Sequence, residues 1–170
     1  MQSKKSLSPA APTAFTLDAY RAGLTETITD RTPRGFEILE EPALPSKPFC
    51  LVRHDIDVSP TRALAVARIE AELGVRATYT VLLSSRFYNA FESKVRDALR
   101  EIAALGHDIG LHFDAAWHGI ADECALADAL EREAQVLARL LNGPPIRMFA
   151  FHDPNTFAMS CRKPSHGGAA

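Results

Sequence analysis

Apolar and polar positions along residues 49–151 follow two alternating periods, and these periods predict the secondary structure. Short apolar, β-branched runs typical of buried strands are separated by stretches in which apolar residues recur every three or four positions, as in helices. The predicted strands are 49–53, 76–83, 107–112 and 146–151, and the helices between them begin at Ser59, Asn89 and Asp122. Strands separated by helices imply right-handed parallel crossovers, so the order predicts an α/β fold with parallel βαβ repeats.

The residues before position 49 have a weaker pattern. Apolar residues at helical spacing after Thr16 predict a helix over 17–28, and four prolines then indicate a loop-rich segment with one short strand at 36–39. The chain therefore divides into a lead-in (1–48), an α/β domain (49–157) and a disordered polar tail (158–170).

Composition places the chain among ordinary single-domain globular proteins. It has 170 residues, of which 46% are hydrophobic and 24% charged, and a formal net charge of -2. This charge gives no basic field for nucleic acid or an anionic membrane surface. No run approaches the ~20 apolar residues of a membrane span, and no signal peptide is evident, so we expect a soluble, cytoplasmic protein. Three widely spaced cysteines are typical of free thiols.

The first predicted strand runs into a cluster of charged residues, Arg53 to Asp57. Side chains at alternate strand positions point the same way, so Asp55 and Asp57 face one ligand while Ile56 faces the core. Two carboxylates repel each other, and a bound metal ion would relieve that repulsion. His54 points to the other face, where we expect burial and a hydrogen bond.

Two other predicted strands also end in residues that bind metals or transfer protons. His112 and Asp114 end the third strand, and His152 and Asp153 end the fourth. In parallel α/β folds the carboxyl ends of the strands share one edge, where functional residues gather. One carboxylate and two imidazoles leave open positions on a divalent ion such as zinc, and a second carboxylate can act as general base. This favours hydrolysis of an ester or amide.

Three motifs carry a resemblance to a known family. The segments LVRHDID (51–57), GHDIGLHFD (106–114) and FAFHDP (149–154) resemble those of the NodB-type polysaccharide deacetylases, particularly uncharacterised bacterial branches. The resemblance covers residues 49–155 and implies a deformed (β/α) barrel that removes N- or O-acetyl groups from a sugar or glycan precursor. It also implies that Asp55 is the catalytic base and that Asp57 and His112 are metal ligands.

The chain departs from the family pattern at the third metal ligand. The family usually supplies a histidine four residues after the first, but this sequence has Ala116 there. Asp114, His118 and His152 are the alternatives, and we favour His152 because it lies at a strand end with a suitable direction of approach.

A second departure is the small number of predicted strands. Four strands form only a partial barrel, shortened at the carboxyl end, with an open sheet edge that favours association into a homo-oligomer. Two alternatives to the deacetylase therefore stay open: a catalytically incompetent remnant that binds metal or glycan, and another metallohydrolase such as a phosphoesterase.

The substrate contacts predicted from the sequence are Arg53, Trp117 and Tyr88. Arg53 either holds the carboxylate pair or ends its strand in an ion pair. Trp117, Phe113 and Tyr88 offer aromatic faces for a sugar ring, although core packing is the more frequent use of such side chains.

Overall fold

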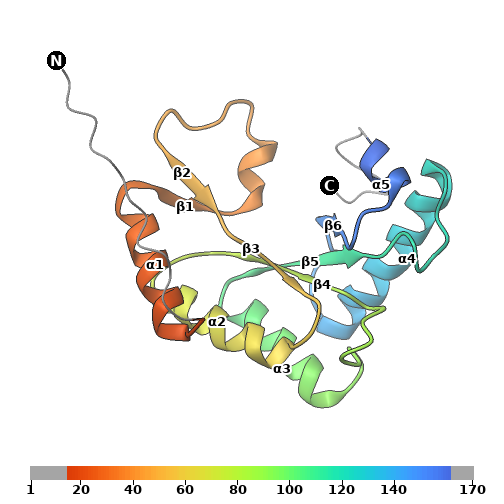
Figure 1. The fold of residues 1–170 in the computed structure, drawn as a ribbon, viewed down its shortest axis with the longest axis horizontal. Coiled ribbons are helices and arrows are strands. Elements are labelled where there is room, and N and C mark those ends of the chain that lie inside the picture. The colour runs from red at the N-terminus through yellow and green to blue at the C-terminus, as the bar shows by residue number, and fades with distance from the viewer. Residues whose placement is uncertain (1–14, 162–170) are drawn as a thin grey trace.

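A four-stranded parallel sheet lies at the centre of the computed structural model, which describes residues 15–161. The sheet is curled into a half-barrel (Figure 1), which confirms the predicted α/β class with parallel βα repeats. Its order is β3-β4-β5-β6. The strands are β3 (Arg53–Ile56), β4 (Thr78–Val81), β5 (Asp108–Phe113) and β6 (Phe149–Phe151).

Helices connect the strands of this sheet and cover one of its faces. Figure 1 shows α2 and α3 on one side of the sheet, and a small lobe containing β1 and β2 on the other. The helices are α1 (Leu17–Asp30), η1, a 3-10 helix (Phe36–Glu40), α2 (Pro60–Glu72), α3 (Ser93–Ala104), α4 (Glu123–Leu141) and α5 (Thr156–Ser160). The predicted tail therefore begins inside α5, and residues 162–170 lie outside the described part.

The ends of α2 and α4 are set by their capping residues. Ser59 accepts a hydrogen bond from the Arg62 amide, and Pro60 fills the first helical position, where its missing N–H is no loss. Asp122 caps α4 in the same way. At the other end of α4, Asn142 has φ 52°, the left-handed conformation that ends many helices. The observed starts of α2 and α4 agree with the predicted ones.

The predicted start of α3 at Asn89 is wrong. The Asn89 side chain accepts the backbone N–H of Phe91 in a turn, and the helix begins only at Ser93. Phe91 therefore lies outside the helix and is exposed. The stripe that packs on the sheet begins instead at Val95.

The amino-terminal lobe also differs from the prediction. Residues 36–39 lie in η1 instead of a strand, because the Gly35 and Ile38 carbonyls accept the Ile38 and Glu41 backbone N–H groups and turn the chain. The lobe contains a separate two-stranded parallel sheet of β1 (Thr32–Arg34) and β2 (Phe49–Leu51).

The first predicted strand, 49–53, is divided between the two sheets. The chain leaves the small sheet at Val52, whose carbonyl accepts the Thr78 N–H, and enters the main sheet as β3. Because β3 continues to Ile56, Asp55 lies within the strand, paired with Thr80 of β4, and only Asp57 follows it.

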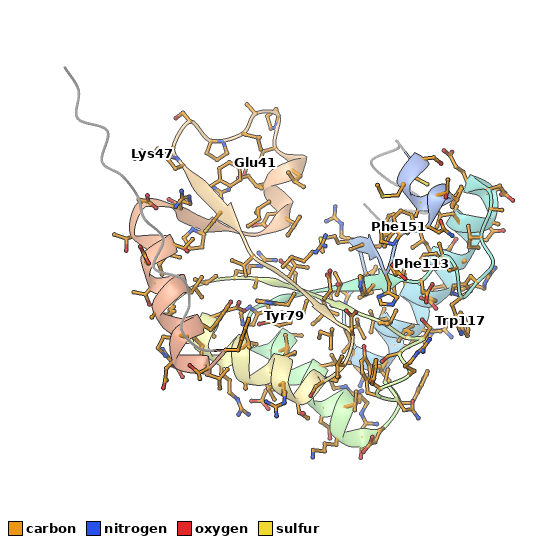
Figure 2. All side chains as sticks on the ribbon, viewed as in Figure 1. Glu41, Lys47, Tyr79, Phe113, Trp117 and Phe151 are labelled. Atoms are coloured by element: carbon orange, nitrogen blue, oxygen red, sulfur yellow. The ribbon has the colours of Figure 1, made fainter. Side chains whose placement is uncertain are left out.

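Alternation along the strands separates the core face from the opposite face. Tyr79 lies on the side of the sheet that faces α2 (Figure 2), together with other fully or nearly fully buried residues. The core-facing strand residues are Ile56, Tyr79, Val81, Leu111 and Phe113. The residues between them, Asp55, Thr80, Gly110 and His112, therefore face away from the helices. In the range 15–161, no helix combines the length and apolar character that a membrane span needs.

Candidate metal centre and general base

Asp57, His112 and His152 meet at the carboxyl edge of the sheet. They come from the loop after β3, from β5 and from the residue after β6, and their ligand atoms all lie within 4.8 Å of one another. His112 Nε2 lies 3.3 Å and His152 Nδ1 3.5 Å from Asp57 Oδ1, and the two imidazole nitrogens are 3.2 Å apart. The sheet thus brings together one carboxylate and two imidazoles from positions that are distant in the sequence.

His112 is oriented with one ring nitrogen free for a ligand. Its Nδ1 lies 3.1 Å from the Ala150 carbonyl oxygen, which can only accept, so Nδ1 carries the proton and Nε2 presents a lone pair. Burial lowers the pKa of His112, although the charges of Asp55 and Asp57 act in the opposite direction. The imidazole is therefore neutral near pH 7, the form that binds a metal ion.

His152 is held by the backbone at the end of β6. Its N–H donates to the Phe113 carbonyl at 2.8 Å, which extends the ladder between β5 and β6 by one residue. The next residue, Asp153, has φ 39°, so the chain turns sharply away directly after the histidine. These features explain how a short strand presents His152 at the sheet edge.

Asp57 has one carboxylate oxygen without a hydrogen-bond partner. The side chain is 44% exposed overall, but its Oδ1 is buried and receives no hydrogen bond from the described residues. A buried oxygen without a hydrogen-bond partner, beside two imidazole nitrogens, is unfavourable unless it coordinates a cation. One carboxylate oxygen and two histidine nitrogens match the donor set of catalytic zinc sites. The residues present therefore fit a divalent ion.

Asp55 lies next to this cluster with a different set of contacts. Its Oδ1 accepts a hydrogen bond from Thr80 Oγ1 at 2.7 Å, and the Arg53 guanidinium contacts both oxygens at about 3 Å. Burial raises the pKa of Asp55, but the Thr80 hydroxyl, His112 and Arg53 outweigh burial and bring it below its ordinary value. Asp55 is therefore ionised at neutral pH.

The two other proposed third ligands have contacts elsewhere. His118 Nε2 lies 2.8 Å from Glu133 Oε1 on α4, and its ring stacks on Phe113. Burial raises the pKa of Glu133 despite this hydrogen bond. The Asp114 carboxylate accepts a hydrogen bond from the backbone N–H of Trp117 in the loop after β5. The geometry groups neither residue with Asp57 and His112.

The predicted substrate contacts have different surroundings. Trp117 is 65% exposed and lies at the periphery of the molecule (Figure 2). The Tyr88 hydroxyl donates to the Ile56 carbonyl and accepts the Leu82 N–H, so it fixes the loop after β4. Phe113 is fully buried and cannot face a sugar ring.

Sequence reasoning missed two residues that support the site. Thr80 binds Asp55, and the Ser85 hydroxyl donates to the Asp57 carbonyl at 2.8 Å. Thr80 could have been found from period-two alternation if the strand register had been known, since it pairs directly with Asp55. Ser85 lies in an irregular loop and gives no such signal.

Behind β3, on the face covered by α2, lies a second polar cluster. Glu70 of α2 is fully buried and accepts hydrogen bonds from His54, Tyr20 and Tyr79. The His54 Nε2 to Glu70 Oε1 distance is 2.6 Å. This is the hydrogen-bonded environment expected for His54. Burial raises the pKa of Glu70, but the three hydrogen bonds and the charge of His54 leave it below its ordinary value.

Comparison with known proteins identifies a structural neighbour. No protein-family model matches the chain, and no curated protein sequence shows significant similarity. The fold is similar to that of the Streptococcus pyogenes deacetylase PplD, solved in complex with acetate, with a TM-score of 0.60 and 15% sequence identity. The match covers 84% of this chain and 66% of that chain, so this chain corresponds to slightly less than two thirds of its neighbour. At this identity the similarity establishes the fold alone.

Proposed function

We propose that the protein is a metal-dependent hydrolase that removes acetyl groups from an N- or O-acetylated sugar or glycan precursor. The convergence of Asp57, His112 and His152 around the unpartnered Asp57 Oδ1 carries this proposal. The fold similarity to a deacetylase solved with acetate supports it, since acetate is the product that deacetylation releases.

Each residue has a defined task in this proposal. Asp57, His112 and His152 hold a divalent ion, which we expect to be zinc. When bound, such an ion supplies Lewis acidity that polarises a carbonyl group and lowers the pKa of water. Asp55, already ionised, is placed to accept the proton of the attacking water. Arg53 holds Asp55 by two contacts, which favours a role in keeping the base in place over direct substrate binding.

Trp117 is the residue best suited to contact a sugar. Its indole is exposed in the loop after β5, at the edge of the sheet that carries the candidate metal centre. An exposed aromatic face supplies apolar contact to a carbohydrate ring. Tyr88 contributes to the substrate region by fixing the neighbouring loop.

Metal analysis combined with product analysis tests the proposal. Protein purified without chelator should carry close to one divalent ion per chain, and His112→Ala should carry much less. Wild-type protein should release acetate from acetylated chitooligosaccharides, and Asp55→Asn should lose this activity by about a hundredfold or more while keeping the ion. Phosphorylated sugars assayed in parallel should release no phosphate. Wild-type protein that binds no ion would contradict the proposal.

A second candidate is a module that binds metal and glycan without turnover. It is favoured by one observation, that Ala116 stands where the family that the motifs resemble usually has its third metal-ligand histidine. This reading predicts ion binding without acetate release, whereas acetate release that depends on Asp55 would exclude it. Association through the open sheet edge and a cytoplasmic location stay predictions from the sequence.

A further inference from the structure

We propose that Thr80 is a positioning residue for Asp55, which it holds in one orientation through a hydrogen bond to Oδ1. This inference rests on the proposed function of Asp55 as general base. It adds a residue that neither the motifs nor the metal-ligand geometry single out.

Thr80 is placed beside Asp55 by the pairing of β3 with β4. The two residues are direct partners in the parallel register, and the Thr80 hydroxyl donates to Asp55 Oδ1 at 2.7 Å. Thr80 is fully buried, so water does not compete for this hydrogen bond. A short hydrogen bond to a carboxylate in such a place restricts the rotation of the carboxylate strongly.

Gly110 leaves room for the methyl group of Thr80 on the side of β4 that faces β5. Thr80 pairs with Gly110 of β5, and a Cβ added at Gly110 would lie 3.2 Å from Thr80 Cγ2 and 3.1 Å from the Met148 carbonyl oxygen. A β-branched side chain has few χ1 rotamers. The methyl group lies towards β5, so the hydroxyl is directed towards β3 and Asp55.

Both carboxylate oxygens of Asp55 are held. Oδ1 accepts the Thr80 hydroxyl at 2.7 Å and lies 3.0 Å from Arg53 Nε in an ion pair. Oδ2 accepts a hydrogen bond from an Arg53 terminal nitrogen at 3.1 Å. The Arg53 side chain is 45% exposed, so the buried Thr80 hydroxyl is the contact that water weakens least.

The strand also offers a matched control. Thr78 lies two residues earlier on the same face of β4 and is equally buried, but its hydroxyl has no hydrogen-bond partner among the described residues. Thr78→Val and Thr80→Val therefore make the same chemical change in the same strand. Only the second removes a donor to Asp55.

The test compares these variants with Thr80→Ser, which keeps the hydroxyl. Each is loaded with Zn²⁺ alone to measure affinity, assayed with 4-nitrophenyl acetate, and crystallised without metal. We expect kcat of Thr80→Val to fall about ten- to hundredfold, with KM and Zn²⁺ affinity within about twofold of wild type. Thr80→Ser should recover most of kcat, and Thr78→Val should match wild type.

The metal-free crystal structures separate this inference from the proposed function. A rotated or disordered Asp55 carboxylate in Thr80→Val, with an unchanged one in Thr78→Val, supports positioning even if the wild-type protein hydrolyses nothing. An Asp55 carboxylate that keeps its orientation in Thr80→Val overturns the inference, as does an unchanged kcat. Thr80→Ala, which also lacks the hydroxyl, replaces Thr80→Val if that variant does not fold.

Discussion

The two faces of the main sheet each carry a partly or fully buried carboxylate beside histidine, but the two carboxylates differ in how their oxygens are satisfied. On the helix-covered face, both oxygens of Glu70 accept hydrogen bonds, Oε1 from Tyr20 and His54 and Oε2 from Tyr79. On the opposite face, Asp57 Oδ1 has no hydrogen-bond donor among the described residues.

This difference separates a structural cluster from a candidate binding site. The Glu70 cluster is complete, so it can stabilise the fold by joining α1, α2 and the sheet without any further group. In the Asp57 cluster, Oδ1 would gain a favourable partner only from a bound cation. Composition alone would not distinguish them, since each combines a carboxylate with histidine side chains.

The largest effect is expected from removing the Glu70 carboxylate. Glu70→Ala leaves two tyrosine hydroxyls and His54 without their buried acceptor, so the free energy of unfolding should fall by about 3–5 kcal/mol. Urea unfolding measures this. The control is Glu72→Ala, which removes an exposed ion pair with Arg21 and should change stability by less than about 1 kcal/mol. Equal losses in the two variants would contradict the structural role of the Glu70 cluster.

The next effect is stabilisation by zinc through the Asp57 cluster. Zn²⁺ at about one hundred times its dissociation constant should raise the free energy of unfolding by about 2.7 kcal/mol, because the unfolded chain lacks the assembled site. Urea unfolding with and without Zn²⁺ measures the difference. His152→Ala should lose most of this stabilisation and Asp55→Asn should retain it. If His152→Ala responds to Zn²⁺ as wild type does, His152 is not a ligand.

A smaller effect on stability is expected when acid protonates Glu70. Because the pKa of Glu70 is lower in the folded protein than its ordinary value of 4.5, its stabilisation is fully present above that value. The stabilisation is lost as pH falls through the folded pKa. Wild type and Glu70→Gln should therefore become more similar in stability as pH is lowered below about 4.5. Unfolding curves at pH 7, 5 and 4 measure this, and a constant difference would show that Glu70 does not titrate in this range.

The smallest effect is expected from Asp57→Asn in metal-free protein. The substitution removes a charge whose Oδ1 receives no hydrogen bond from residues 15–161, so stability in the presence of EDTA should stay within about 1 kcal/mol of wild type. Zn²⁺ should then fail to stabilise the variant. A loss above about 2 kcal/mol without metal would mean that Asp57 has a structural role comparable to that of Glu70.

The sequence predicted the repeating part of the fold well because its signals are local. The caps at Ser59 and Asp122 depend on neighbouring residues alone. The division of the first predicted strand was missed because non-local pairing decides it. The chain divides at Val52 because the residues before it pair with β1 and the residues after it pair with β4.

The candidate site was predicted only in part. The rule that strand ends share one edge was sufficient to propose Asp57, His112 and His152 together, and the geometry groups these three residues. The role of Thr80 depends on the register between β3 and β4, and the engagement of His118 with Glu133 depends on how the loop after β5 packs on α4. Neither can be read from local sequence.

The all-parallel order of the sheet also determines when the candidate metal centre can form during folding. Every strand pairing spans a helical crossover, and His112 and His152 are 40 positions apart in the chain. Such non-local pairings form slowly, because loop closure must precede the contacts that reward it. The three candidate ligands therefore converge only after β6 has docked beside β5, so a bound ion could not template an early folding step. In a rapid-mixing experiment, binding of Zn²⁺ during refolding would therefore occur only after the native topology is complete.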